Sequence, residues 1–149
     1  MRPSLTPERG GLLARSLSGV ATKAEQKLLE RVRAICMGFP EVTERLSHGE
    51  ATWFIRDKKV LATMDDHHHG ADHFAVTCPA PPGVQQELVE AEPERFYRPP
   101  YVGPAGWIGV RLDRDVDWDE IEQILDDAYR MKAPKALIKI LDQGEQAHG

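Results

Sequence analysis

Three consecutive histidines, His67–His69, are the residues with the clearest capacity for chemistry in this chain. Asp65 precedes them and His73 follows. Imidazole and carboxylate groups are common ligands of Zn, Ni and Fe. Because neighbouring side chains of an extended run point to opposite sides, only His67 and His69 would share a side. The pattern predicts either a metal site built on His67 and His69 or, as the simpler interpretation, a solvated loop between two strands.

His48 is the second candidate, because it follows a serine and precedes Gly49. A serine beside a histidine is reminiscent of nucleophilic catalysis, but adjacency in sequence does not supply the geometry that a triad needs. The chain also lacks the Gly-x-Ser-x-Gly elbow of serine hydrolases. We therefore assign no catalytic residue, expect no cofactor, and treat His48 as a turn residue that contributes to a ligand or metal site.

Aromatic residues suggest a binding groove. Several of them come from one proline-rich segment, 96–107, and from the strand that contains Trp53. An apolar concavity with a few polar groups is the usual form of a ligand site. The alternative is that the tryptophans simply fill the core. The predicted ligand-binding residues are His48, Trp53, Phe96, Arg98, Tyr101 and Trp107.

Aromatic rings flanked by basic residues also stack nucleobases. The predicted phosphate contacts are Arg56, Lys58, Lys59, Arg98 and Arg111. The chain as a whole is acidic, with 19 Lys and Arg against 24 Asp and Glu, so its formal net charge is −5. A protein of this balance lacks the general positive field on which non-specific DNA binding depends.

The composition is that of a globular protein: 149 residues, 41% hydrophobic and 29% charged. This length is typical of one domain with a real core. No apolar run approaches the roughly 18 residues of a membrane-spanning helix, which makes the cytoplasm the expected location. Cys36 and Cys78 are isolated and are expected to be small buried residues.

The strongest structural signal is a hairpin over Ala51–Met64, in which Asp57 and Lys58 separate two runs rich in β-branched and aromatic residues. A two-residue turn would pair Ile55 with Val60 and Phe54 with Leu61. Trp53, Ile55, Val60, Ala62 and Met64 would then share one face, and Phe54 and Leu61 the other.

The remaining elements follow from periodicity and from breaking residues. Helices are expected over Lys23–Gly38 and Val84–Ala91 and from Asp117 onwards, with strands over His73–Cys78 and Gly106–Leu112. The region 39–49 is interpreted as a loop with at most a short edge strand. Residues 1–22 and 142–149 are expected to be flexible tails around a single domain, 23–141. The expected class is α+β, a two-layer α-β(3)-α-β(2)-α arrangement with an antiparallel sheet.

The order of these segments resembles the MmcQ/YjbR-like family of small bacterial proteins. The matching segments are Phe39–Glu44, the Trp53–Thr63 hairpin, the aromatic segment leading into Gly106-Trp107, and the Asp117–Arg130 helix. The resemblance implies an antiparallel sheet with helices mainly on one face, similar to secretion chaperones. It also implies DNA binding through two wings. Many members have a basic stretch before the fifth strand, where this chain has Val102–Trp107 and only the tryptophan matches.

Three functions remain open from the sequence. The first is a DNA-binding module, and the second is a stress-response protein that binds a small molecule or metal through the aromatic groove and the histidine loop. The third is a scaffold whose open sheet face or edge meets a partner protein, an analogy at the level of fold. An enzyme is the least supported class. No membrane partner is expected, and the chain would be a monomer or a homodimer.

Overall fold

The computed structural model describes residues 21–66 and 73–148. Two compact units divide the chain, Met1–Arg31 and Val32–Gly149. In the first unit, Thr22 and Glu25 form a capping box at the start of helix α2: each backbone N–H donates to the other's side chain at 3.1 Å. The fold described below belongs to the second unit, in which α2 ends.

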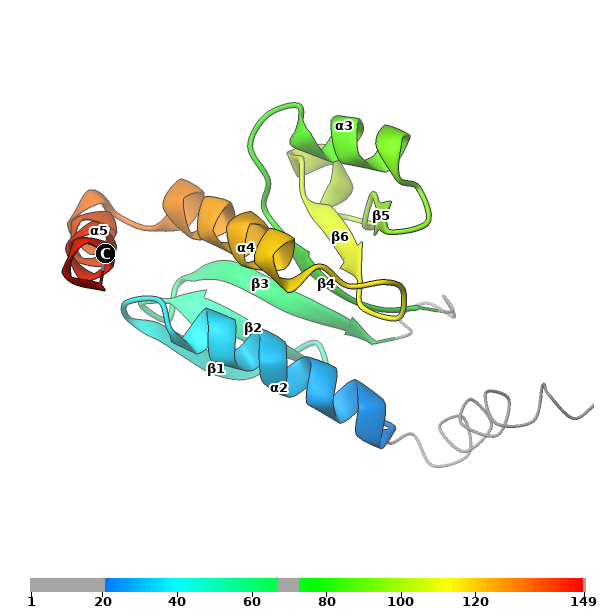
Figure 1. Ribbon diagram of the computed structural model, residues 1–149, viewed down its shortest axis with the longest axis horizontal. Helices are drawn as coiled ribbons and strands as arrows, with labels where there is room; N and C mark the ends of the chain where they lie inside the picture. Colours follow the sequence, from blue (N-terminus) through cyan, green and yellow to red (C-terminus); the bar gives the residue numbers. More distant parts are fainter. Residues whose placement is uncertain (1–20, 67–72, 149) are drawn as a thin grey trace, which may run out of the picture. The chain divides into compact units, whose positions relative to one another are not determined.

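The second unit is built around one antiparallel sheet of six strands in the order β1-β2-β3-β4-β6-β5 (Figure 1). Together with its helices it confirms the predicted α+β class. In chain order the elements are α2 (Lys23–Met37), β1 (Val42–Ser47), β2 (Glu50–Ile55), β3 (Lys59–Asp66), β4 (Phe74–Cys78), α3 (Val84–Ala91), β5 (Phe96–Tyr97), the 3-10 helix η3 (Gly103–Ala105), β6 (Ile108–Arg111), α4 (Trp118–Lys132) and α5 (Lys135–His148).

Strand β1 lies at the sheet edge, in the region where a loop with at most a short edge strand was expected. It pairs with β2 along its whole length, from Val42 opposite Ile55 to Ser47 opposite Glu50. His48 and Gly49 form the turn with φ angles of 53° and 81°. Two successive positive φ angles are the signature of a type I′ turn, which matches the twist of paired strands. The weak alternation of β1 is explained by its position at the sheet edge, where most of its side chains stay solvated.

The β2–β3 hairpin differs from the predicted register. Three residues, Arg56, Asp57 and Lys58, form its turn, so Ile55 lies opposite Lys59 and Phe54 opposite Val60. The register then shifts at Trp53, which lies opposite Ala62. The shift leaves the intervening Leu61 as an extra residue, a β-bulge. The prediction that Val60 shares a face with Trp53 was therefore wrong. The longer turn places Val60 opposite Phe54, whose side chain lies on the other face of the sheet from that of Trp53.

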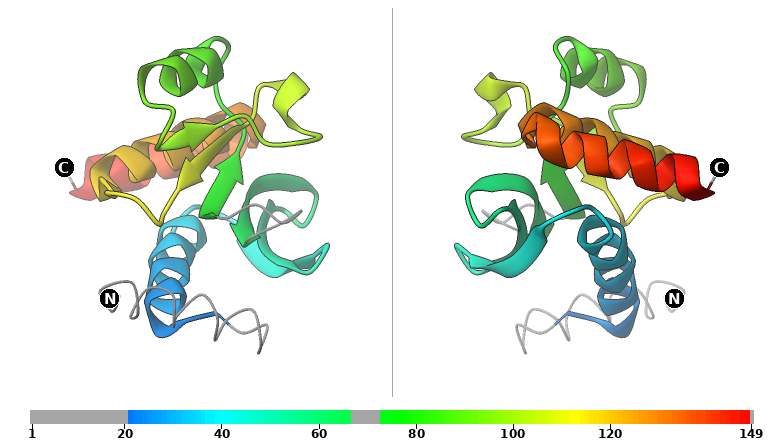
Figure 2. Two further views of the ribbon diagram at one scale, coloured as in Figure 1. Left: turned by 90° about the vertical axis from the view of Figure 1, so that its right-hand side faces the viewer. Right: turned by 90° about the vertical axis from the view of Figure 1, so that its left-hand side faces the viewer.

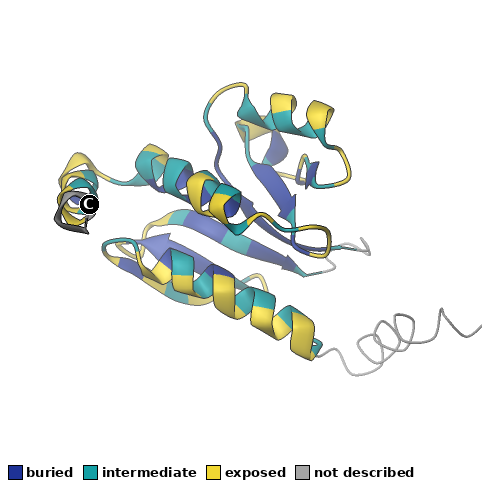
Figure 3. Ribbon diagram, viewed as in Figure 1, coloured by how far each residue is buried: buried dark blue, intermediate teal, exposed yellow. Residues whose placement is uncertain are grey.

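The two faces of the sheet have different chemistry. One, which we call the helix face, bears Trp53, Met64, Val76, Val110 and Phe96, all at most 3% exposed. The other, the threonine face, bears Thr52, Thr63 and Thr77 in directly opposed positions of β2, β3 and β4. Strands β2, β3, β4 and β6 are the most deeply buried part of this unit (Figure 3).

Helix α4 packs over β3 on the helix face (Figure 1). Asp117 caps it by accepting a hydrogen bond from the Glu120 N–H at 3.2 Å, as the sequence predicts. Its inward stripe contains Ile121, Leu125, Ala128 and Tyr129. The Tyr129 hydroxyl donates to the Pro40 carbonyl at 2.8 Å, and burial raises the pKa of Tyr129 to about 12.

A polar cluster ties the end of α2 to the same face. Arg33 donates two hydrogen bonds to the Glu44 carboxylate, at 2.7 and 2.9 Å, and the Trp53 indole N–H donates to it at 2.9 Å. The hydrogen bond from Arg33 lowers the pKa of Glu44 below its ordinary value. The cluster fixes Trp53 in one orientation, with no exposed surface.

The chain ends in helix α5, which continues to His148 and so includes most of the predicted C-terminal tail. Most of the predicted N-terminal tail, residues 1–20, lies outside the described residues. Figure 2 shows α5 and the strands from two sides. Among the helices of the described ranges, none combines the length and the apolar composition that a bilayer crossing requires.

Candidate ligand pocket on the threonine face

Five strands contribute to one row of residues on the threonine face. Thr52 lies opposite Thr63, Thr63 opposite Thr77, Thr77 opposite Gly109, and Gly109 opposite Tyr97. Threonine is common in strands because its β-branched side chain suits a pleated sheet. Here the small threonine side chains and the glycine leave unfilled space above the centre of the threonine face.

The threonine hydroxyls bond to one another and to the backbone. The Oγ1 atoms of Thr52 and Thr63 are 2.7 Å apart, and Thr77 donates to the Thr63 carbonyl at 3.3 Å. Thr52 and Thr63 also contact the carbonyls of Glu50 and Ala51, at 3.1 and 3.4 Å. The hydroxyl hydrogens are thus used within the protein, so the row presents mainly oxygen lone pairs.

A pocket of about 680 Å³ lies over this row. Its volume is in the range of small-molecule sites, roughly 300–1,000 Å³. The first turn and strands β2–β4 form its floor and one side, and the segment after β5 forms the opposite wall. The lining residues are Ser47, His48, Glu50, Thr52, Val60, Thr63, Met64, Asp65, Thr77, Pro99, Pro100, Tyr101, Val102 and Trp107.

The aromatic wall is held by local backbone geometry. Gly106 adopts φ 92° directly before Trp107, and Tyr101 adopts φ 67°, which is unusual for a residue with a side chain. Tyr101 is 83% exposed at the edge of the pocket. The Gln85 side-chain amide of α3 donates to the carbonyls of Gly103 and Trp107, the first at 2.9 Å. Gln85 thereby connects α3 to both ends of the 3-10 turn and positions Trp107.

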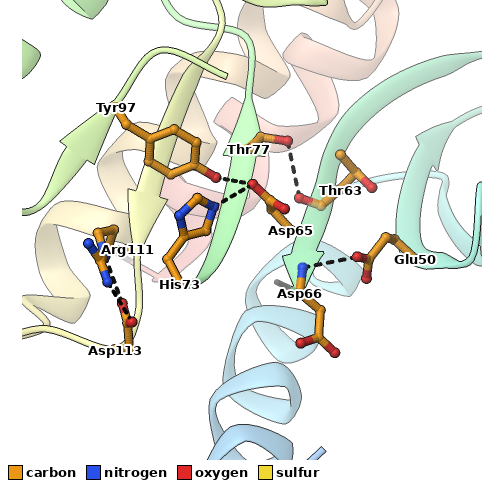
Figure 4. A network of polar contacts seen from close by, with 9 residues as sticks. All are labelled: Glu50, Thr63, Asp65, Asp66, His73, Thr77, Tyr97, Arg111 and Asp113. Atoms are coloured by element: carbon orange, nitrogen blue, oxygen red, sulfur yellow. Dashed lines mark hydrogen bonds and ion pairs between the residues drawn. The ribbon is translucent and has the colours of Figure 1, made fainter. Parts of the chain in front are cut away.

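A second polar cluster adjoins the pocket at Asp65. Its Oδ2 accepts a hydrogen bond from the Tyr97 hydroxyl and lies 2.8 Å from Nε2 of His73 (Figure 4). The two rings lie against each other, with centroids 4.4 Å apart. Burial, followed by the bond to Asp65, raises the pKa of Tyr97 far above its ordinary value. Tyr97 therefore remains a protonated donor at neutral pH and keeps Asp65 in a fixed position.

Gly109 is essential to the position of the Tyr97 ring. The Tyr97 ring lies directly on it, and a Cβ at residue 109 would come within 2.3 Å of the ring. Such a distance is shorter than any allowed contact, so only glycine fits below the ring. The row of small residues therefore ends in a glycine that seats an aromatic side chain.

The predicted ligand-binding residues separate into three groups. His48, Tyr101 and Trp107 line the pocket together. Trp53 and Phe96 point to the helix face, where they are 0% and 1% exposed. Arg98 lies elsewhere, in a shallow depression of about 230 Å³ beside α3, and its side chain covers Gly103.

The predicted phosphate contacts are spread over the sheet. Arg56, Lys58 and Lys59 are exposed at the β2–β3 turn. Arg111 pairs opposite Ala75 and hence lies near the Asp65 end of β3. The two ends of the eight-residue strand β3 are about 23 Å apart, at roughly 3.3 Å per residue.

Carboxylates also neutralise part of the positive charge of these arginines. Arg56 forms an ion pair with Glu41 at 2.9 Å, and Arg111 forms one with Asp113 at 2.8 Å. Arg45, on the edge strand, lies 3.5 Å from Asp57. The described residues thus show no single basic surface that includes all five predicted positions.

The predicted metal ligands His67 and His69 lie outside the described residues. Within residues 21–66 and 73–148, no group of three or more His, Cys, Asp or Glu side chains is arranged to hold a metal ion. Cys36 and Cys78 are free and buried, as predicted. Burial raises the pKa of both thiols, that of Cys78 to about 12, so neither is a reactive thiolate at neutral pH.

Fold and pocket together define a small α+β protein with one helix-covered sheet face and a ligand-sized pocket on the other. The sequence profile of the YjbR family matches residues 37–131, more than half of the chain. The chain therefore belongs to the YjbR family, as its segment order predicted. No curated protein and no solved structure matches it significantly.

The threonine row, Gln85 and the Asp65 cluster were missed by the sequence reasoning. The threonines alternate with buried apolar residues in each strand, which was a usable signal. Their alignment, however, depends on the strand registers. The contact between Asp65 and Tyr97, separated by 32 positions, had no local signal.

Proposed function

We propose that the protein binds a small organic molecule in the pocket on the threonine face. The observation that carries the proposal is the composition of that pocket: a volume of about 680 Å³, a floor of threonine hydroxyls and a wall that contains Tyr101 and Trp107. Concave sites that are mostly apolar, with a few fixed polar groups, are the usual form of ligand sites. A cytoplasmic location in a bacterium is part of this proposal.

Backbone strain beside the pocket supports the same view. Tyr101 has a positive φ angle of 67° and lines the pocket. Non-glycine residues in this conformation cost about 1 kcal/mol or more and are concentrated at binding sites. A large aromatic side chain that is held exposed at this cost has no role in the core.

Nucleic-acid binding has less support. The basic side chains predicted to contact phosphates lie in separate places, and two of them are paired with carboxylates. DNA binding depends on several cations that act on neighbouring phosphates. It is tested by a mobility-shift titration at low salt, in which a Lys58→Ala/Lys59→Ala variant with weaker binding would favour DNA.

The pocket proposal is tested by a fragment screen with ligand-observed NMR. Hits should raise the melting temperature of the wild-type protein, because a ligand that binds only the folded state stabilises it. Ser47→Trp should abolish binding by filling the pocket from β1. Leu46→Trp is the matched control, because Leu46 is the next residue on the same strand, is 74% exposed and does not line the pocket.

Two results would contradict the proposal. One is the absence of any hit from a screen in which both variants are shown to be folded by circular dichroism. The other is a set of hits that Ser47→Trp leaves unchanged, since the binding would then occur elsewhere on the protein.

A further inference from the structure

The ionisable groups of the pocket are predominantly acidic. Its lining includes the carboxylates of Glu50 and Asp65 and, among the described residues, neither lysine nor arginine. Among the described lining residues, His48 is the one histidine. The chain's net charge of −5 adds a field of the same sign. An anionic ligand would therefore enter the pocket against repulsion.

The hydrogen-bonding groups point to the same conclusion. The hydroxyl hydrogens of Thr52, Thr63 and Thr77 are used within the protein, as their contacts of 2.7–3.4 Å show. The floor accordingly offers oxygen lone pairs to a ligand and few donors. A floor of acceptors suits a ligand that brings N–H or O–H groups, and an ammonium group brings up to three.

The wall supplies the third part of the argument. Trp107 and Tyr101 face the pocket together with Pro99 and Pro100. Tryptophan and tyrosine rings attract cations through their negative faces and also stack with flat apolar groups. A ligand with a positive charge and an apolar body would satisfy the wall and the floor at once.

We infer that the pocket binds an organic cation, a protonated amine carried on an aromatic or apolar body. This inference rests on the proposed function and specifies its ligand. The amine lies on the side of Glu50 and the threonine row, and the apolar body lies against Trp107 and the prolines. Phosphate esters, nucleic acids and carboxylic acids are disfavoured by the same charges.

The experiment compares three probes with the same indole ring. Tryptamine is a cation at neutral pH, tryptophol is neutral and indole-3-propionate is an anion. Isothermal titration calorimetry should give tryptamine an affinity at least about tenfold higher than that of indole-3-propionate, with tryptophol between them. The difference in affinity should shrink at high salt, because ions screen the partly exposed carboxylate of Glu50. Trp107→Ala should lower the affinity for all three probes.

Two charge variants assign the preference to the pocket. Glu50→Gln removes one negative charge and retains an acceptor for the Asp66 N–H, which now bonds to Glu50 at 2.9 Å. This variant should lower the affinity for tryptamine several-fold and leave the affinity for tryptophol unchanged. Glu122→Gln on α4 makes the same charge change at an exposed position outside the pocket lining and should have no effect.

The outcomes separate the inference from the proposed function. If tryptophol or indole-3-propionate binds as tightly as tryptamine, and Trp107→Ala weakens that binding, the pocket is a ligand site but the inferred cation preference is wrong. If none of the three probes binds the folded wild-type protein while the fragment screen gives hits that Ser47→Trp abolishes, the inference fails and the proposed function stands. If the fragment screen gives no hits either, both fail.

Discussion

The helix face and the threonine face come from the same strands, often from adjacent residues, yet they have opposite properties. Ala62 and Trp53 lie opposite each other on the helix face and are completely buried. Thr63 and Thr52, one residue further along each strand, bound a pocket. Because side chains alternate along a strand, one stretch of sequence can build a filled core and a hollow site. The difference comes from what covers each face: helix α4 packs on the helix face, whereas a pocket lies over the threonine face.

The largest expected effect comes from Gly109, which supports Tyr97 on the threonine face. Gly109→Ala places a methyl group within 2.3 Å of the ring and must displace it from Asp65. We expect a loss of about 3 kcal/mol in the free energy of unfolding, measured by urea denaturation, as is typical of overpacking.

A double-mutant cycle tests the cause of that loss. In a Tyr97→Ala background the added methyl group meets no ring, so Gly109→Ala should change stability by less than about 0.5 kcal/mol. Equal costs in both backgrounds would show that the clash with Tyr97 is not responsible.

Neighbouring residues on the two faces provide the next comparison. Ala62→Leu adds bulk to the filled helix face and should cost about 2 kcal/mol. Thr63→Leu adds one heavy atom, directed towards the pocket, and should cost about 1 kcal/mol, mainly for the lost hydroxyl bonds. Denaturation of the two variants under the same conditions measures the difference. A larger cost for Thr63→Leu would contradict a hollow threonine face.

The Glu44 cluster predicts a pH-dependent stability of the helix face. The pKa of Glu44 is lowered in the folded state, so its stabilisation is complete above the unfolded value of about 4.3 and is lost as the pH falls through the folded pKa. Glu44→Gln should cost about 1–2 kcal/mol at pH 7, a modest value because Arg33 is 40% exposed.

The acid profile separates this cluster from general acid unfolding. The gap in stability between wild-type and Glu44→Gln protein should narrow as the pH falls from about 4.3 through the lowered folded pKa, below which Glu44 is protonated in both folded and unfolded chains. A gap that stays constant from pH 7 to pH 3 would exclude the ion pair as its source.

The smallest effect concerns the thiols of the helix face. Cys36 and Cys78 are buried and their pKa values are raised. Neither should react with a thiol reagent in the native protein at pH 8, and both should react at once in denaturant. Ser47→Cys supplies the matched control, because a thiol in the pocket wall should react without unfolding.

Much of the architecture was predictable from the chain. Helices over 84–91 and from Asp117, and strands around Val76 and Val110, agree with their expected positions because periodicity and capping residues are local signals. The buried cysteines and the family were predictable for the same reason. Strand β1 was predicted poorly, because an edge strand has little apolar alternation and is stabilised by its partner's backbone.

The candidate site was predictable only in part. Three of the six predicted ligand-binding residues, His48, Tyr101 and Trp107, meet in the pocket. Trp53 and Phe96 lie on the helix face and Arg98 lies beside α3, because packing between elements far apart in the chain decides which face of the sheet is covered. The extra residue in the β2–β3 turn and the bulge at Leu61 change only the side on which Val60 lies, and no local rule locates both.

By itself, the sequence determined the kinds of elements, their order, the family and the acidic character of the chain, since these depend on composition and on neighbours a few residues apart. Only the tertiary structure decided that Thr52, Thr63, Thr77 and Gly109 form one row and that Tyr97 lies at its end. The reason is physical: the row exists through hydrogen-bonded registers between strands far apart in the chain, and a shift of one residue in any of them would turn its side chains to the opposite face.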